Sequence, residues 1–119
     1  MLFNLDRKPV TTVPYAAEYR TYMSRLMPAE IRAIKDELNA KIDADEIHTA
    51  GWMPGNNWTG TPFQPIYEKA ARYSYKASAM CFGLMVWEVF MERPENWCSG
   101  HFELNGEDIG SRTYFRIRD

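Results

Sequence analysis

The sequence predicts a small α+β domain, with three to four helices packed on a small antiparallel sheet. Two stretches in the first half, 14–26 and 28–43, carry apolar residues at helical spacing. The last quarter of the chain instead alternates apolar and polar residues, which is typical of strands. Because helices and strands occupy separate parts of the chain, this order favours α+β over a parallel sheet with crossover helices.

The size and composition are those of one globular domain, covering residues 1–119. The chain is 45% aliphatic or aromatic and 25% charged, which is ordinary for a folded protein. Its net charge of −2 gives no broad electrostatic footprint for nucleic acid, so we expect no such partner. Only Cys81 and Cys98 are present and no secretory signal precedes them, which predicts free thiols and a cytoplasmic location without membrane attachment.

The first half predicts an arm and two helices. Residues 1–13 read as an extended arm, because Leu2 and Phe3 can begin a strand and 10–13 are rich in β-branched residues. Pro14 then opens a helix over 14–26. Pro28 opens a second helix of about sixteen residues. Glu30 lies in its first turn, where the helix dipole favours an acidic side chain. Its buried face consists of Ile31, Ile34, Leu38 and Ile42.

The middle of the chain predicts a short strand, a loop and a broken helix. A strand is expected over 46–50, and the three glycines and three prolines of 51–65 exclude a regular element there. Helical spacing then runs from Pro65 to Arg93-Pro94. One helix of that length would be ~40 Å long, against an expected domain diameter of ~35 Å. We therefore expect a break near 74–78.

The end of the chain predicts a hairpin. Alternation favours strands near 97–104 and 109–118, and Asn105-Gly106 is a strong hairpin dipeptide. A two-residue turn would place Glu103 opposite Asp108, and such a like-charge pair is costly. We therefore expect a wider turn with solvated acids.

The loop at 51–65 is the most unusual feature, because it contains several large aromatic side chains although loops normally lie on the solvent-exposed surface. Trp52, Trp58 and Phe63 lie in it, and Tyr67 follows one helical turn beyond. The rings can plug one end of the core, line a binding pocket, or form an oligomer interface. In a pocket, Asn56, Asn57, Thr59 and Gln64 would supply polar groups, and Glu46 or Glu68 would favour a cationic or planar organic ligand.

The run from Gly51 to Glu68, followed by Phe82-Gly83-Leu84, resembles small orphan proteins carried on bacterial mobile gene cassettes of the integron type. The resemblance covers about a third of the chain and includes no diagnostic motif. It implies a bacterial accessory protein, and it implies no catalytic residues.

Cysteine and histidine suggest two further chemistries. Cys98 and His101 could form a nucleophile pair, but three residues along a strand place their side chains on opposite faces. The chain also has enough cysteine and histidine to supply the four ligands of a zinc site, namely Cys81, Cys98, His48 and His101. No C-x-x-C knuckle supports it, so structural cysteines are the favoured interpretation.

Charged residues suggest three more sites. The carboxylates of Glu103, Glu107 and Asp108 could hold Mg²⁺ or Ca²⁺. The basic strand Arg112, Tyr114, Phe115, Arg116 and Arg118 could contact nucleic acid, or pair across the sheet and guard an edge. Glu88, inside the most apolar helix, needs a partner, for which His48, Arg112 or Arg116 are candidates.

The leading prediction is a non-catalytic binding or interaction protein whose aromatic loop (51–67) recognises a small organic ligand or a protein partner. No catalytic residue, metal ligand or cofactor is assigned. The predicted ligand-binding residues are Trp52, Asn56, Asn57, Trp58, Phe63, Gln64, Tyr67 and Glu88. The alternative is a small metal-assisted hydrolase or transferase using the hairpin carboxylates with His101. A homo-oligomeric scaffold with the tryptophans buried between subunits is a third hypothesis.

Overall fold

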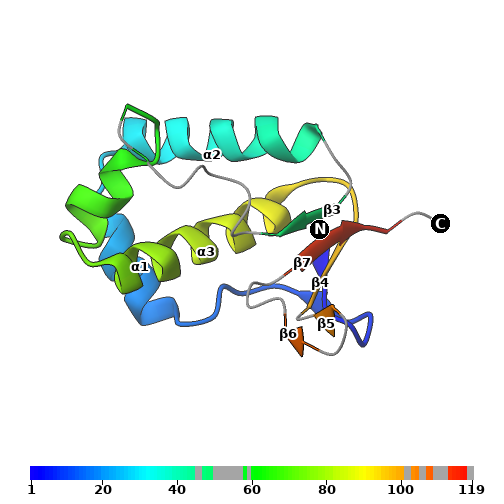
Figure 1. Cartoon of the computed structure of the whole chain (residues 1–119). Coiled ribbons are helices and arrows are strands. Elements are labelled where there is room, and N and C mark those ends of the chain that lie inside the picture. Colours follow the sequence, from blue (N-terminus) through cyan, green and yellow to red (C-terminus); the bar gives the residue numbers. More distant parts are fainter. Residues whose placement is uncertain are drawn as a thin grey trace.

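The computed structural model describes residues 1–44, 47–49, 58, 60–100, 103–104, 107–108 and 113–117, with the backbone alone at 47–49, 103–104 and 107–108. The predicted α+β class is confirmed. In Figure 1, the strands of the main sheet gather at one end of the molecule, while the short helix η2 (Ile66–Ala70) and the start of α3 (Tyr75–Glu92) lie at the other.

The main sheet has the strand order β2-β1-β4-β7-β3. Its strands are β1 (Leu2–Phe3), β2 (Pro9–Val10), β3 (Ile47–Thr49), β4 (Trp97–Gly100) and β7 (Thr113–Arg116). The neighbours β1 and β4 run parallel, so the sheet is mixed rather than wholly antiparallel as the sequence predicts. The difference arises because the N-terminal arm turns back on itself as the hairpin β1–β2, and its first strand docks on β4.

The predicted C-terminal hairpin is split in two. β4 pairs with β7 from Trp97↔Arg116 to Gly100↔Thr113, whereas β5 (Glu103–Leu104) and β6 (Glu107–Asp108) form a separate two-stranded sheet. Leu104 is paired with Glu107, which leaves only residues 105 and 106 between the strands. The expected wider turn is therefore wrong, because the backbones of Glu103 and Asp108 are paired directly opposite each other.

The two N-terminal helices follow the predicted order. Helix α1 covers Ala16–Ser24, two residues shorter at each end than 14–26. Helix α2 covers Pro28–Asp43, as predicted from its proline start and apolar stripe. The Met27 backbone N–H donates to the Glu30 carboxylate at 2.8 Å, which satisfies a group that the first helical turn leaves unpaired.

The predicted break in the third helical region is confirmed, but it lies at 71–74, slightly before 74–78. η2 is a π-helix, and α3 begins afresh after Ser74, whose hydroxyl accepts from the Ala77 backbone N–H at 3.2 Å. Between them Arg72 and Tyr73 have φ of 49° and 65°. Such left-handed backbone costs a residue with a side chain about 1–2 kcal/mol, so this junction is strained twice in succession.

The core is centred on α3, which packs on α2, α1 and the sheet (Figure 1). At the sheet end, the Phe90 ring stacks on Tyr114 with centroids 4.1 Å apart and meets Trp97 at 4.9 Å. All three rings are buried. Near them, the Arg93 guanidinium binds Asn39 Oδ1 at 2.7 Å and forms ion pairs with Asp43 and Glu95. This network ties the end of α3 to the end of α2.

Candidate functional site

The described rings of the aromatic loop belong to the core. Trp58 and Phe63 have centroids 6.0 Å apart, and each lies 5.5 Å from Phe82 of α3. Phe63 is only 2% exposed, and Trp58 is half-buried against the same cluster. These two side chains plug one end of the core, which is one of the alternatives that the sequence leaves open. Trp52, Asn56 and Asn57 lie outside the described residues.

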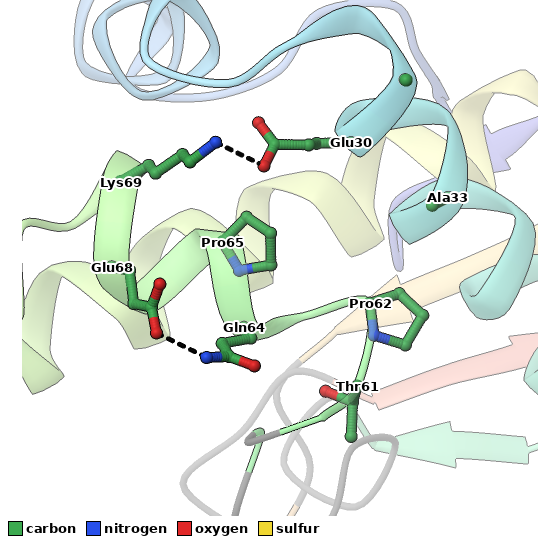
Figure 2. A pocket seen from close by; sticks show the side chains of 9 residues that line it. Glu30, Ala33, Thr61, Pro62, Gln64, Pro65, Glu68 and Lys69 are labelled. Carbon is green, nitrogen blue, oxygen red and sulfur yellow. Dashed lines mark hydrogen bonds and ion pairs between the residues drawn. The ribbon is translucent and has the colours of Figure 1, made fainter.

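Directly beyond these rings, the chain forms one wall of an open pocket of about 370 Å³. The opposite wall is the first two turns of α2, so the pocket lies between two segments that are distant in sequence (Figure 2). Its lining consists of Ala29, Glu30, Ala33, Thr61, Pro62, Gln64, Pro65, Glu68 and Lys69. Of the predicted ligand-binding residues, Gln64 is the one that the described structure places in this lining.

Local hydrogen bonds fix the wall formed by 60–64. The Thr61 hydroxyl donates to the Trp58 carbonyl at 2.7 Å and accepts from the Phe63 N–H at 3.2 Å. The Gly60 N–H donates to Gln64 Oε1 at 2.9 Å, with Gly60 at a φ of 77° that favours glycine. Because Phe63 is anchored in the core, the turn holds Gln64 against a rigid support.

Two polar contacts border the pocket, and Figure 2 shows both as dashed lines. Lys69 Nζ lies 2.7 Å from Glu30 Oε2 and so bridges the two walls. This contact, together with the Met27 N–H, lowers the pKa of Glu30. The Gln64 amide donates to Glu68 Oε1 at 2.5 Å. Within the described part of the chain, Glu68 forms no ion pair, so its negative charge is available at the pocket rim.

Tyr67 does not line the pocket. Its ring instead meets Tyr73 and Tyr75, with ring centroids 5.3 Å and 5.4 Å apart. We call Tyr67, Tyr73 and Tyr75 the tyrosine cluster. Tyr73 and Tyr75 are 65% and 83% exposed, which is unusual for such large rings.

Glu88 does not line the pocket either. Its carboxylate lies 2.5 Å from Lys35 Nζ of α2, which also contacts Glu92 at 2.9 Å. The sequence analysis did not name Lys35 as the partner, because only the packing of α3 on α2 brings the two together. Burial, followed by the Glu88 carboxylate, raises the pKa of the Tyr19 hydroxyl.

The described cysteines are poorly suited to nucleophilic chemistry. Burial raises the pKa of Cys81 to about 12. Burial also raises the pKa of Cys98, whose thiol donates to the Asn4 carbonyl at 3.5 Å. His101 and the His48 side chain lie outside the described residues, and so do the side chains of Glu103, Glu107 and Asp108. Among the described side chains no group of three or more His, Cys, Asp and Glu could hold a metal ion, and the metal-assisted alternative stays a prediction.

The basic C-terminal strand offers fewer exposed rings than its sequence suggests. Tyr114 is 1% exposed and stacked on Phe90, so it cannot stack on a base. The Arg116 guanidinium lies 6.0 Å from the centroid of the Trp97 ring. Arg112 and Arg118 lie outside the described residues.

Sequence reasoning missed the α2 wall of the pocket, which consists of Ala29, Glu30 and Ala33. These residues read as an ordinary solvated helix face, and no local pattern connects them to residues 61–69. The Glu30–Lys69 contact joins positions 39 residues apart. It therefore depends on the packing of the two segments, which periodicity does not reveal.

The comparisons with known proteins give no relative. No protein-family model matches the chain, no curated protein is similar to it, and no solved structure matches its fold. The resemblance to mobile gene cassette proteins stays a prediction. Among the described helices, none has the length and apolar character that a membrane crossing requires.

Proposed function

We propose that this chain is a binding protein whose recognition site is the pocket between the start of α2 and residues 61–69. Its ligand is a small organic molecule with a cationic or amide group, or a peptide side chain of that chemistry. The observation that carries the proposal is the Glu68 carboxylate at the rim of a preformed pocket of about 370 Å³ (Figure 2). That volume falls within the range of small-molecule sites, roughly 300–1,000 Å³.

The pocket chemistry supports a cationic ligand over an anionic one. Ala29, Ala33, Pro62 and Pro65 supply apolar surface that an organic body can cover. Of the charged side chains, Glu30 and Lys69 neutralise each other, which leaves the charge of Glu68. A ligand cation beside Glu68 would gain a charge-assisted hydrogen bond.

The aromatic loop supports the site indirectly. Phe63 and Trp58 anchor the turn from which Gln64 reaches the pocket, so their rings position the wall. We infer that Trp52, Asn56 and Asn57 complete the recognition surface, as the sequence predicts. In this account the rings of Trp58 and Phe63 stabilise the fold, and the polar side chains of the loop contact the ligand.

The test is isothermal titration calorimetry with benzylamine and agmatine, and with benzyl alcohol as a neutral analogue of benzylamine. We expect the amines to bind and benzyl alcohol to bind at least tenfold more weakly. Ala33→Leu fills the pocket and should abolish amine binding. Ala40→Leu is the matched control, because Ala40 is also exposed on α2 but does not line the pocket.

Glu68→Gln keeps the shape of the rim and removes its charge. It should weaken amine binding about tenfold while leaving the melting temperature almost unchanged, since exposed ion pairs and charges contribute little to stability. Amine binding that survives both Ala33→Leu and Glu68→Gln would show that the ligand site is elsewhere.

A further inference from the structure

The tyrosine cluster lies on η2 and the start of α3, at the end of the molecule away from the main sheet (Figure 1). Tyr67 is its centre, because its ring contacts those of both Tyr73 and Tyr75. The two outer rings expose most of their surface. A stable monomer gains little from large rings held in water, so this arrangement is suited to an external partner.

The backbone that presents Tyr73 is strained. Arg72 and Tyr73 both adopt positive φ, where glycine would be free of strain. A backbone hydrogen bond of 2.8 Å from the Tyr73 N–H to the Tyr67 carbonyl holds the junction and brings the two rings together. Strained non-glycine residues are concentrated at binding sites, where the surrounding structure holds them in place.

Two exposed cations lie within the sequence span of the tyrosine cluster, although the whole chain is acidic. Arg72 and Lys76 are exposed and form no ion pair with any described residue. The first turn of α3 contains no acidic residue to offset the partial positive charge of the helix N-terminus. Residues 67–76 therefore combine exposed aromatic faces with two cations that have no ion-pair partner among the described residues, against the single carboxylate of Glu68, which lies at the rim of the amine pocket.

We propose that the tyrosine cluster binds single-stranded nucleic acid, with Tyr73 and Tyr75 stacking on bases and Arg72 and Lys76 contacting phosphates. Aromatic rings next to basic side chains are the elements by which proteins bind single strands without sequence preference. The net charge of −2 argued against a broad footprint, but it does not describe this local surface. A protein partner is the competing occupant, and it would not explain the unpaired cations as directly.

The experiment is fluorescence anisotropy of the full chain with a labelled oligothymidylate about 12 nucleotides long, near 50 mM salt. Tyr73→Ala and Tyr75→Ala should each weaken binding about fivefold or more, as expected for loss of one stacked base. Tyr73→Phe should bind almost as well as the parent, because stacking needs the ring and not the hydroxyl.

Tyr15→Ala is the matched control for Tyr73→Ala. Tyr15 is 64% exposed and has a φ of 52°, yet it makes no ring contact with any described residue. It should leave oligothymidylate binding unchanged. Arg72→Ala should reduce the slope of log affinity against log salt by about one, whereas Arg32→Ala, an exposed arginine of α2, should not change it.

Three outcomes would overturn the proposal. One is no anisotropy change at high micromolar protein, which would favour a protein partner. Another is equal binding to a duplex of the same length with no effect of the tyrosine variants, which would indicate attraction to phosphate alone. The third is a loss with Tyr15→Ala as large as with Tyr73→Ala. Ala33→Leu separates this site from the amine pocket, because it should block benzylamine and leave oligothymidylate binding intact.

Discussion

The sheet end and the η2 end of the molecule use aromatic residues in opposite ways. At the sheet end, Phe90, Tyr114 and Trp97 are at most 2% exposed and pack face to face or edge to face. At the η2 end, Tyr73 and Tyr75 are mostly exposed, although they too contact a third ring. Ring contact is common to both ends, but Tyr73 and Tyr75 lack the burial of the three sheet-end rings.

The backbone differs between the two ends as well. The sheet end is joined by regular strand pairing and by the Arg93 network with Asn39, Asp43 and Glu95. The η2 end has a π-helix, two consecutive left-handed residues and an open pocket. We therefore expect the sheet end to contribute more to stability, and we propose the η2 end as the recognition surface.

The largest expected effect is at Phe90. Phe90→Ala removes a fully buried ring from between Tyr114 and Trp97, and it should lower the free energy of unfolding by about 3–5 kcal/mol. Urea unfolding followed by far-ultraviolet circular dichroism measures the loss. If this variant does not fold, Phe90→Leu keeps most of the volume and should cost about 1.5 kcal/mol.

Tyr73→Ala provides the comparison with the η2 end. Tyr73 is 65% exposed, so its ring should contribute no more than about 0.5 kcal/mol to stability. The contrast between the two ends would be broken if Tyr73→Ala cost as much as Phe90→Ala. In that case the tyrosine cluster would be a structural element rather than a recognition surface.

Periodic patterns in the sequence were enough to predict the regular elements. Helix α2 begins at Pro28 as expected, because a proline start and a strip of Ile34, Leu38 and Ile42 are local signals. The strand over 46–50 is confirmed as β3 at 47–49. The parallel pairing of β1 with β4 was missed, because it joins residues more than ninety positions apart. Nothing in the local sequence records such a partner.

The candidate site was predictable only in part. Gln64 was named because polar groups in an aromatic loop suggest a pocket, and it does line one. Phe63 was named for the same reason, but it is a core residue. The sequence does not distinguish the two cases, because a phenylalanine in a loop can be either buried or exposed. The left-handed backbone of Tyr73 gave no signal, because glycine is the usual marker of that conformation and none is present.

A smaller effect is expected at Glu30. The Lys69 contact and the Met27 N–H lower the pKa of Glu30, so its ionised form stabilises the folded state. Because part of the carboxylate is in contact with water, the contribution should be about 0.5–1 kcal/mol near neutral pH. It is fully present above the ordinary glutamate pKa of ~4.3 and is lost as the pH falls through the lowered value.

Glu30→Gln keeps an acceptor for the Met27 N–H and removes the charge. Urea unfolding should show the variant less stable at pH 7, with the difference shrinking as the pH falls through the lowered pKa of Glu30 and the glutamate becomes neutral. Glu37→Gln is the control on the same helix, since Glu37 lies 3.7 Å from Lys41 in an exposed pair that should contribute almost nothing. A difference that does not shrink as the pH falls would assign the effect to shape rather than charge.

The smallest effect tests the strain itself. Arg72→Gly relieves a left-handed residue, worth about 1–2 kcal/mol, but glycine adds unfolded-state entropy that costs roughly 0.5–1 kcal/mol. The net expectation is a gain in stability of about 0.5 kcal/mol in urea unfolding. Arg32→Gly, in the helical backbone of α2, should instead lose about 1 kcal/mol. A gain in stability for Arg72→Gly with a loss for Arg32→Gly would show that the backbone at the tyrosine cluster is destabilising. A loss of stability for both variants would show that the junction holds no strain.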